Sequence, residues 1–564
     1  MSLERDGVPL PAPRGRKSWA VLARLARATA PIPRHVLAEE LFDEADDPLG
    51  ALRWTLTELR RAVGLPEAFR GDPLPPLSTP GLELDVGELA RGRLPEPWPE
   101  GRFLEGLDAG AGAAFAAWLA VERHRVDGEL LAALRQHTLK AISARDAERA
   151  VSLAGAMVRR APYEEGHHVL LVKALAESGD AEAAARQAEA SERLFARELG
   201  VTASPAIRAA ARPSVAGPVP GIGQHATATS LCEAGLAALA AGAADAGIEC
   251  LRGATHAAER ARDARLLARC LIELGTALVH AVRGYDDEGA VMLSAGLERA
   301  SAAGDAALAA KAYSELAYTD LQAGRRISAA QNLAAAEGLA GEDLSLRAAI
   351  AGFAAMNLHD GGDPAAAAEG FGQALELSRS AGAARREAWV LGLGARSLYT
   401  LGRLEEAAEW AQGSCRVASS ERWTAFRPWP EAWMGHIGLV QGRDPVDVRE
   451  AAEATFVLAR QIQDPCWEGL AAKTVGLTHL ATGDPVTALA WMENAAALCR
   501  RVTDSYHWLD VEILLAVAGA AWAAGRTEHA LDAAQRALAL AAQGSMEAQV
   551  ARGQEFLARS SGAA

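Results

Sequence analysis

Apolar residues recur at helical spacing along most of the chain, and small residues mark a repeat in its C-terminal part. A glycine follows an apolar helical stretch again and again, at intervals of 42, 40, 38, 40, 40, 41 and 42 residues. These glycines are Gly242, Gly284, Gly324, Gly362, Gly402, Gly442, Gly483 and Gly525. A fixed period of this length is typical of helical repeat proteins, so the pattern predicts eight repeats of about forty residues.

Two further positions in each repeat support this prediction. The residue seven places before the glycine and the residue twelve places after it are small in all eight repeats. The residue five places after it is small in seven, and Asp447 is the exception. Antiparallel helices joined by a glycine turn approach closely only where both present small side chains, and stacked hairpins then share one core. We therefore expect an α-solenoid over residues 226–564.

The N-terminal part has a different pattern. Three amphipathic stretches at residues 16–30, 33–42 and 48–64 are separated by proline, acidic and glycine breakers, which is typical of a three-helix, helix-turn-helix unit. The alternating residues 81–89 predict a short strand pair, where a wing would lie. Residues 100–211 are helical, and turns at Arg145 and Gly179, 34 residues apart, predict two shorter hairpins.

The predicted helix at residues 48–64 has two faces. Leu52, Leu56, Leu59 and Val63 fall within one arc and are expected in the core. The opposite side carries candidates for contacts with phosphates and guanine edges, with further basic candidates in the preceding segment. These DNA-binding candidates are Arg53, Trp54, Thr57, Arg60, Arg61, Arg16, Lys17 and Arg34. The alternative is an ordinary solvated helix face.

Composition divides the chain without changing this picture. Proline- and glycine-rich stretches at residues 92–101 and 212–223 suggest a domain at 1–95, a second at 100–211, a linker at 212–225 and the solenoid at 226–564. The formal net charge of −15 argues against nucleic acid along the whole chain, but residues 213–564 alone carry −12. The fold class is thus mainly α, with a small α+β domain at the N-terminus.

Candidate chemistry is sparse. The sequence has no zinc-binding spacing of cysteines, no nucleotide-binding GxxxxGK[ST] motif and no hydrolase or metalloprotease motif, so we predict neither an enzyme nor a cofactor or metal site. The adjacent His167 and His168 are interpreted as helix-surface histidines, and the six cysteines as buried thiols. No secretion or membrane-spanning segment is evident, which indicates a cytoplasmic protein.

Tryptophan is concentrated in the predicted solenoid. Nine of the thirteen tryptophans lie between Trp389 and Trp522. The densest group comprises Trp423, Trp429 and Trp433, beside Arg427. Bulky rings between columns of alanine fill gaps between hairpins, which is one explanation; the other is a groove for a ligand or partner, since aromatic residues and arginine anchor recognition.

The motifs resemble a known family. The run DGVPLP, GRKSWAVLARLA and ALRWTLTELRRAVG is similar to the OmpR-like winged helix of bacterial antibiotic-regulatory-protein type transcriptional regulators. FLEGL, Trp118, the Glu122–Arg123 pair and the terminal ELG at residues 198–200 resemble the bacterial transcriptional activation domain that follows it, and the solenoid resembles tetratricopeptide repeats, with a longer period. Two departures stand out: only four residues precede Arg5, where the family has a strand, and the nucleotide-binding module of larger members is missing.

The resemblance implies a DNA-binding transcriptional regulator, an activator by type. Its partners would be double-stranded DNA and RNA polymerase, with the middle domain pairing two copies of the chain or contacting polymerase. The repeats would receive a signal from a protein or a small molecule, and no membrane would be involved. The alternative, from another functional class, is a repeat scaffold whose winged helix no longer binds DNA.

Overall fold

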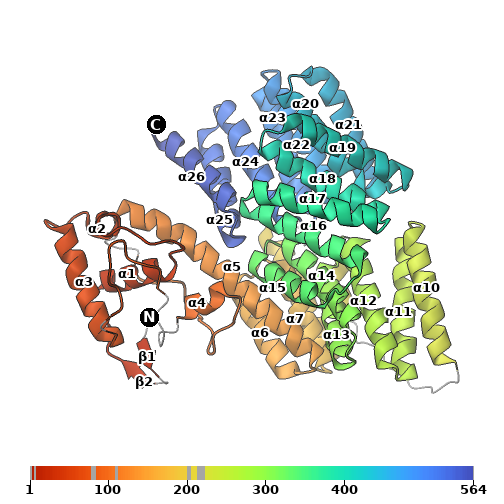
Figure 1. Cartoon of the computed structure of the whole chain (residues 1–564), viewed down its shortest axis with the longest axis horizontal. Coiled ribbons are helices and arrows are strands. Elements are labelled where there is room, and N and C mark those ends of the chain that lie inside the picture. The colour runs from red at the N-terminus through yellow and green to blue at the C-terminus, as the bar shows by residue number, and fades with distance from the viewer. Residues whose placement is uncertain are drawn as a thin grey trace. The chain divides into compact units, whose positions relative to one another are not determined.

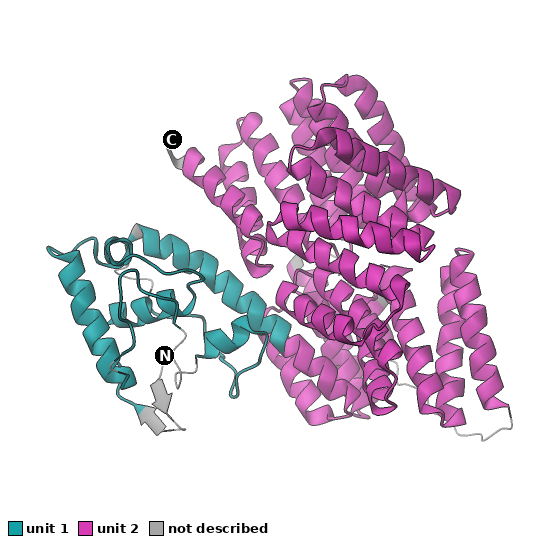
Figure 2. Cartoon of the chain, in the orientation of Figure 1, with its two compact units in different colours: residues 1–133 teal, residues 134–564 magenta. Residues whose placement is uncertain are grey.

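A computed structural model of the chain describes residues 3–5, 8–65, 67–77, 84–107, 112–199, 205–211, 223–281, 283–502 and 504–562 (Figure 1). Internal contacts divide the chain into two units, residues 1–133 and 134–564 (Figure 2). The division falls within one long helix and not at the proline-rich stretch near residue 95, where the sequence suggests a domain boundary.

The first unit contains a short strand pair and four complete helices in its described residues. Its elements are β1 (Leu3–Arg5), β2 (Val8–Leu10), α1 (Arg16–Ala26), α2 (Arg34–Phe42), α3 (Pro48–Val63), α4 (Asp85–Ala90) and the first part of α5 (Ala113–Ser143). The three helices predicted between residues 16 and 64 are therefore confirmed.

Local chemistry explains the bounds of α3. The Asp47 side chain accepts a hydrogen bond from the Gly50 N–H and so caps the first turn, and Pro48 occupies a position where a missing N–H costs nothing. Gly64 ends the helix with a φ of 65°. Leu52, Leu56, Leu59 and Val63 are buried, as the periodicity predicts. They pack with residues from α1, α2 and the start of α5, including Leu25, Leu37 and Phe115.

The predicted wing is not confirmed. Residues 81–83 lie outside the described part of the chain, and residues 85–90 form α4 where a strand was expected. Extended pairing among the described residues is limited to the antiparallel β1–β2 pair, in register Leu3 to Leu10, and one bridge between Ile32 and Leu74. In the described residues 84–89, the Val86 and Leu89 side chains are buried on one face of α4, so this part of the segment does not form the expected strand.

The middle helices form the two expected hairpins. After α5 come α6 (Ala147–Arg160), α7 (Glu165–Glu177), α8 (Ala181–Leu194), the π-helical turn Phe195–Leu199 and α9 (Pro205–Ala210). Arg145 and Gly179 occupy the turns, with φ values of 58° and 86°. Asp146 and Asp180 cap the helices that follow, by accepting from Arg149 N and Ala183 N.

The predicted solenoid is present as stacked helical hairpins within the described ranges. Its helices are α10 (Gln224–Ala240), α11 (Ala244–Ala261), α12 (Ala264–His280), α13 (Asp286–Ala302), α14 (Ala306–Gln322), α15 (Arg326–Leu339), α16 (Leu344–Gly361), α17 (Pro364–Ser380), α18 (Ala384–Thr400), α19 (Leu404–Ser420), α20 (Pro428–Val440), α21 (Pro445–Ile462), α22 (Pro465–Ala481), α23 (Pro485–Cys499), α24 (His507–Ala523), α25 (Thr527–Gln543) and α26 (Glu547–Gly562). The 3₁₀ turn Thr424–Phe426 precedes α20.

The periodic glycines lie at the hairpin turns. All eight have positive φ, from 71° at Gly525 to 100° at Gly362, which L-residues adopt only with strain. In seven hairpins the second helix begins two residues after the glycine, but α21 begins three after Gly442. That extra residue explains the exception at Asp447: Val448, one place later, takes the buried position.

The small columns allow close helix packing. In the column seven places before the turn, a Cβ added at Gly235 of α10 would lie 2.9 Å from the Gly247 oxygen of α11. A Cβ added at Gly275 of α12, two places before the column residue Ala277, would lie 2.8 Å from the oxygen of Gly289, a column residue of α13. At these two glycines even a methyl group would push the helices apart. The small residues are therefore a steric requirement of the hairpin.

Candidate functional site

The solvent face of α3 presents most of the predicted DNA-binding side chains. Arg53, Trp54, Thr57 and Arg61 are exposed, and 55% of Trp54 is accessible. The Arg53 guanidinium forms an exposed ion pair with Asp47 at 3.4 Å. The exposed Arg61 guanidinium pairs at 3.0 Å with Glu58, whose side chain is mostly buried. An exposed pair contributes little to stability, so a phosphate can replace the Asp47 carboxylate at Arg53 at low cost. This group is the surface to which nucleic acid could bind.

Two other candidates, Arg60 and Arg34, bind the chain's own backbone instead. The Arg60 guanidinium donates to the carbonyl oxygens of Ala68 and Phe69, at 2.8 Å each. The Arg34 Nε donates to the Gly71 oxygen at 2.7 Å, and its backbone N–H donates to Asp72. Both side chains thus hold the loop that follows α3. The periodicity placed Arg60 at the flank of the face and could not show that the chain would fold back onto it.

The basic residues of α1 are also divided. Arg16 is exposed, whereas Lys17 lies over the Phe42 ring, 5.1 Å from its centre. Arg24 pairs with Glu40 at 2.9 Å and lies over the Trp118 ring. Arg27 is almost fully enclosed. Of the basic cluster in residues 16–27, Arg16 has the freest access to a phosphate.

Arg27 lies at the centre of a buried ion cluster. Its guanidinium donates to Glu122 at 2.5 Å, to Glu129 at 2.7 and 2.9 Å, and to the Val86 carbonyl oxygen at 3.2 Å. Burial raises the pKa of Glu129, and the hydrogen bond and charge of Arg27 act against that rise. Two carboxylates from α5 are therefore held by one cation at the C-terminal end of α1.

The FLEGL and Glu122–Arg123 motifs are joined by hydrogen bonds. Arg123 donates to the carbonyl oxygens of Phe103 and Leu104, at 2.9 and 3.0 Å. Leu104 and Gly106 have positive φ, and Leu104 and Leu107 are buried. The arginine therefore stabilises the tight turn that brings both leucines into the core of the first unit.

The aromatic group in the solenoid is mostly interior. Trp429 has no exposed surface and its Nε1 donates to the Gly392 oxygen at 2.9 Å, while 4% of Trp433 is exposed. Trp423 stacks on Phe426 with ring centres 4.7 Å apart, and Arg427 pairs with Glu431. The groove interpretation is wrong for Trp429 and Trp433, because packed neighbours already cover their rings; gap filling accounts for both.

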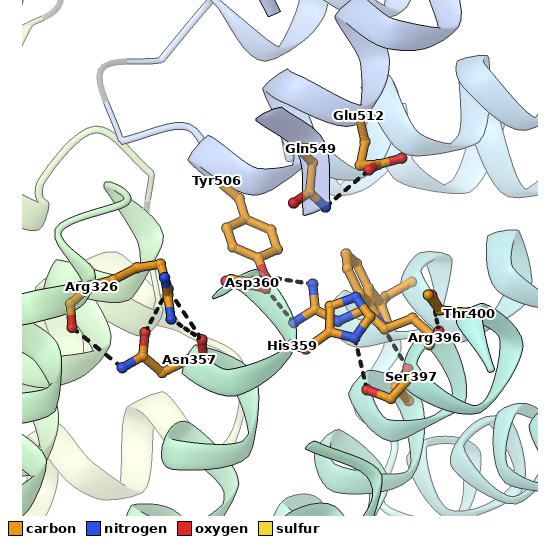
Figure 3. A network of polar contacts seen from close by, with 12 residues as sticks. Arg326, Asn357, His359, Asp360, Arg396, Ser397, Thr400, Tyr506, Glu512 and Gln549 are labelled. Carbon is orange, nitrogen blue, oxygen red and sulfur yellow. Dashed lines mark hydrogen bonds and ion pairs between the residues drawn. The ribbon is translucent and has the colours of Figure 1, made fainter. Parts of the chain in front are cut away.

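Part of the chain itself occupies the space beside Trp429. The Tyr506 hydroxyl donates to Asp360 of α16 at 2.8 Å and accepts from Arg396 of α18 at 2.6 Å, and Arg396 pairs with Asp360 at 2.8 Å (Figure 3). The tyrosine ring centre lies 6.2 Å from that of Trp429. Burial raises the pKa of Asp360, and Arg396 and Tyr506 act to lower it.

Similar contacts join other distant hairpins. The Arg326 Nε donates to Asn357 at 3.0 Å (Figure 3). The Arg326 Nη1 donates to the Ser545 carbonyl oxygen at 2.5 Å. Arg283 pairs with Asp464 at 3.0 Å, and the Gly284 N–H donates to Asp504 at 2.6 Å. Nothing in the periodicity indicates these partners, since 180 or more residues separate most of them.

The two adjacent histidines are not both surface residues. His168 is buried; its Nε2 donates to the Pro162 carbonyl oxygen at 2.9 Å, and Ser191 lies 2.7 Å from Nδ1. His167 is partly buried, and burial lowers its pKa to about 4. The surface interpretation is wrong for His168, because α7 packs this face against α8.

Other reactive groups give little. Of the six cysteines, all without disulfides in the described structure, Cys250 and Cys415 are partly exposed and the others are buried. Within the residues described, no three His, Cys, Asp or Glu side chains gather as a metal ion would need. Nor is any described helix both long and apolar enough to cross a bilayer.

Comparison with known families identifies one segment. Residues 98–213 match the family model described as "Bacterial transcriptional activator domain". This range includes FLEGL, Trp118 and the Glu122–Arg123 pair, so the resemblance is confirmed for these residues. The match covers less than half of the chain and does not reach residues 1–95, for which the winged helix and DNA binding stay predictions. The search of curated proteins finds no match.

Solved structures with similar helical arrangements share little sequence. A chain of the APC/C hetero-tetramer Cut9–Hcn1 has 13% identity and a TM-score of 0.32, covering 79% of this chain and 97% of that one. A Rap protein complexed with competence and sporulation factor has 14% identity and a TM-score of 0.33, and the match covers 75% of this chain and 99% of that one. The apo quorum sensor NprR from B. thuringiensis has 11% identity and a TM-score of 0.37, and the match covers 65% of this chain and 97% of that one. At these scores, the solenoid assignment depends on the hairpins themselves.

Proposed function

We propose that the protein is a DNA-binding transcriptional regulator, an activator by type, that works in the cytoplasm without enzymatic activity. The observation that carries the proposal is the match of residues 98–213 to the transcriptional activator domain. The exposed face of α3 would contact double-stranded DNA, the matched segment would contact RNA polymerase or pair two copies, and the repeat array would receive a protein or small-molecule signal.

The geometry of α3 supports the DNA contact. Arg53, Trp54, Thr57 and Arg61 share one exposed side of a helix whose other side is fully buried. Guanidiniums on an exposed helix suit phosphates and guanine edges. The surrounding acids keep net charge low, so binding should be modest and salt-sensitive.

A mobility-shift assay tests this function. We expect the full chain to shift DNA from the region upstream of its own gene, or fragments selected from the genome, with a band that weakens as salt rises. Arg53→Ala with Arg61→Ala should weaken binding about ten- to a hundredfold and flatten the salt dependence, because two cationic contacts are lost.

A matched control separates specific from general charge effects. Arg500→Ala with Arg536→Ala removes two charges from the solenoid and should leave the shift unchanged. Equal loss in both double variants, or no salt-sensitive band at all, would contradict the proposal.

The scaffold alternative has one specific observation in its favour. Arg34 and Arg60, two of the eight candidate DNA contacts, bind backbone carbonyls of the chain's own loop. If no DNA is shifted while a polymerase subunit or another protein is retained by the full chain, the scaffold function is the better one.

A further inference from the structure

A pocket of about 460 Å³ lies within the second unit, among four helices. One wall comes from the C-terminal part of α5, and the others come from α13, α14 and α15. This volume is typical of sites for small organic molecules. The α5 wall belongs to the activator-domain segment and the others to the second and third repeats.

The buried charged residues that line the pocket, Arg135 and Asp320, form its base, and their charges are already compensated. Arg135, which is buried, donates to Asp287 at 2.7 Å and lies 3.6 Å from Asp320. Asp320 also accepts from Arg325 at 2.7 Å and from Asn332 at 3.0 Å. An ionised ligand group would lose its hydration here without finding an unpaired charge, so the base disfavours ions.

The walls offer unused hydrogen-bonding groups beside apolar surface. Among the described residues, none makes a hydrogen bond to the side chain of Gln136, Ser294 or Tyr313. Leu139 of α5 and Leu316 of α14 supply apolar contact. A site with both features matches a molecule with an apolar body and several hydroxyl or carbonyl groups.

Two exposed lining residues carry charge, Lys140 of α5 and Glu298 of α13. They have opposite signs and both reach water. Charges in that setting are screened and select weakly between ligands. The compensated base and the unpaired polar walls therefore decide the class of ligand.

We propose that this pocket binds an uncharged organic molecule with an aromatic or aliphatic body and hydroxyl or carbonyl groups. Bound there, the molecule would contact α5 and the repeats together and so favour the state in which the activator segment packs on the array. Its role as the effector site depends on the proposed function; the binding itself does not.

The test uses a matched pair of probes, 6-hydroxy-2-naphthamide and 6-hydroxy-2-naphthoate, and the full chain without DNA. By isothermal titration calorimetry we expect the uncharged amide to bind at one site with a Kd of about 1 mM or tighter, and the carboxylate about tenfold more weakly or worse. Because no DNA is present, a failed mobility shift leaves this result untouched.

Two variants locate the site, one on α13 and one on α5. Ser294→Phe on α13 and Ser143→Phe on α5 each place a ring in the pocket and should weaken amide binding about tenfold or more. The control, Ser380→Phe at an exposed position of α17, should bind like the wild type. Circular dichroism checks the fold of each variant, and either pocket variant suffices if the other fails to fold.

Three results would overturn the proposal: no saturable binding of the amide to the wild type, tighter binding of the carboxylate, or unchanged amide binding in a folded pocket variant.

Discussion

The role of Arg27 in the structure differs from the role that its sequence context suggests. In the sequence it is one of several basic residues that precede α2. In the structure two glutamates of α5 enclose it. Burial acts to lower the pKa of Arg27, but the hydrogen bonds and charges of Glu129 and Glu122 outweigh that effect and the pKa is raised. Its function is to fix α5 on α1.

Removing this cation should loosen the first unit. Arg27→Gln removes the cation that Glu129 is hydrogen-bonded to and leaves Glu122 with its 3.4 Å pair to Arg125; breaking a buried pair costs about 3–5 kcal/mol. Hydrogen exchange measured by mass spectrometry should accelerate in α1 and in residues 113–133. Arg53→Gln, at an exposed pair, is the control and should leave exchange unchanged; equal protection in both variants would show that the cluster contributes nothing.

At the scale of the element, the hairpin depends on small residues for contact and on glycine for the turn. These are separate requirements, since the turn glycines have positive φ whereas Gly275 lies in a helix and permits close approach. The sixth hairpin also shows that the two requirements are separate. Its turn is one residue longer, and the buried position of its second helix moves from 447 to 448.

Two glycine-to-alanine substitutions in helices should have opposite effects. In Gly275→Ala the new Cβ would lie 2.8 Å from the Gly289 oxygen, and overpacking of this kind costs about 1–3 kcal/mol. In Gly519→Ala no atom lies within 4 Å, so the helix should gain about 0.5–1 kcal/mol. Hydrogen exchange should speed up in α12 and α13 for the first and slow in α24 for the second. Destabilisation by both would mean that helix propensity and packing do not explain the effect of these two glycines.

At the scale of the whole array, distant hairpins are joined by buried polar contacts. Asp360, Arg396 and Tyr506 connect α16, α18 and the segment before α24, and all three are buried. A linear solenoid transmits order only between neighbouring repeats. These contacts predict that the fourth, fifth and eighth hairpins lose structure together.

Tyr506→Phe tests that coupling. The variant removes the hydroxyl that bonds both Asp360 and Arg396, at a cost of about 1.5–3 kcal/mol for a hydrogen bond to a charged group. Exchange should accelerate in α16, α18 and α24 together and stay unchanged in α10 and α11. Tyr163→Phe, at a residue with 52% exposure, is the control. Acceleration confined to α24 would show that the hairpins open independently.

The candidate surfaces were only partly predictable. The buried side of α3 and the exposure of Arg53, Trp54, Thr57 and Arg61 follow from helical periodicity, which depends on neighbours in sequence. The contacts of Arg60 and Trp429 were harder to predict, because each depends on a loop or a hairpin elsewhere in the chain.

The sequence by itself determined the helices, the hairpin turns, the small columns and the activator-domain motifs, because helix periodicity, glycine conformation and steric size act over a few residues. Tertiary structure alone decided that Arg27 is a core cation, that His168 and Trp429 are interior, that Tyr506 reaches Asp360 and that a pocket forms beside α5. Each of these depends on which distant surfaces meet, and burial, charge compensation and enclosed volume exist only once they have met.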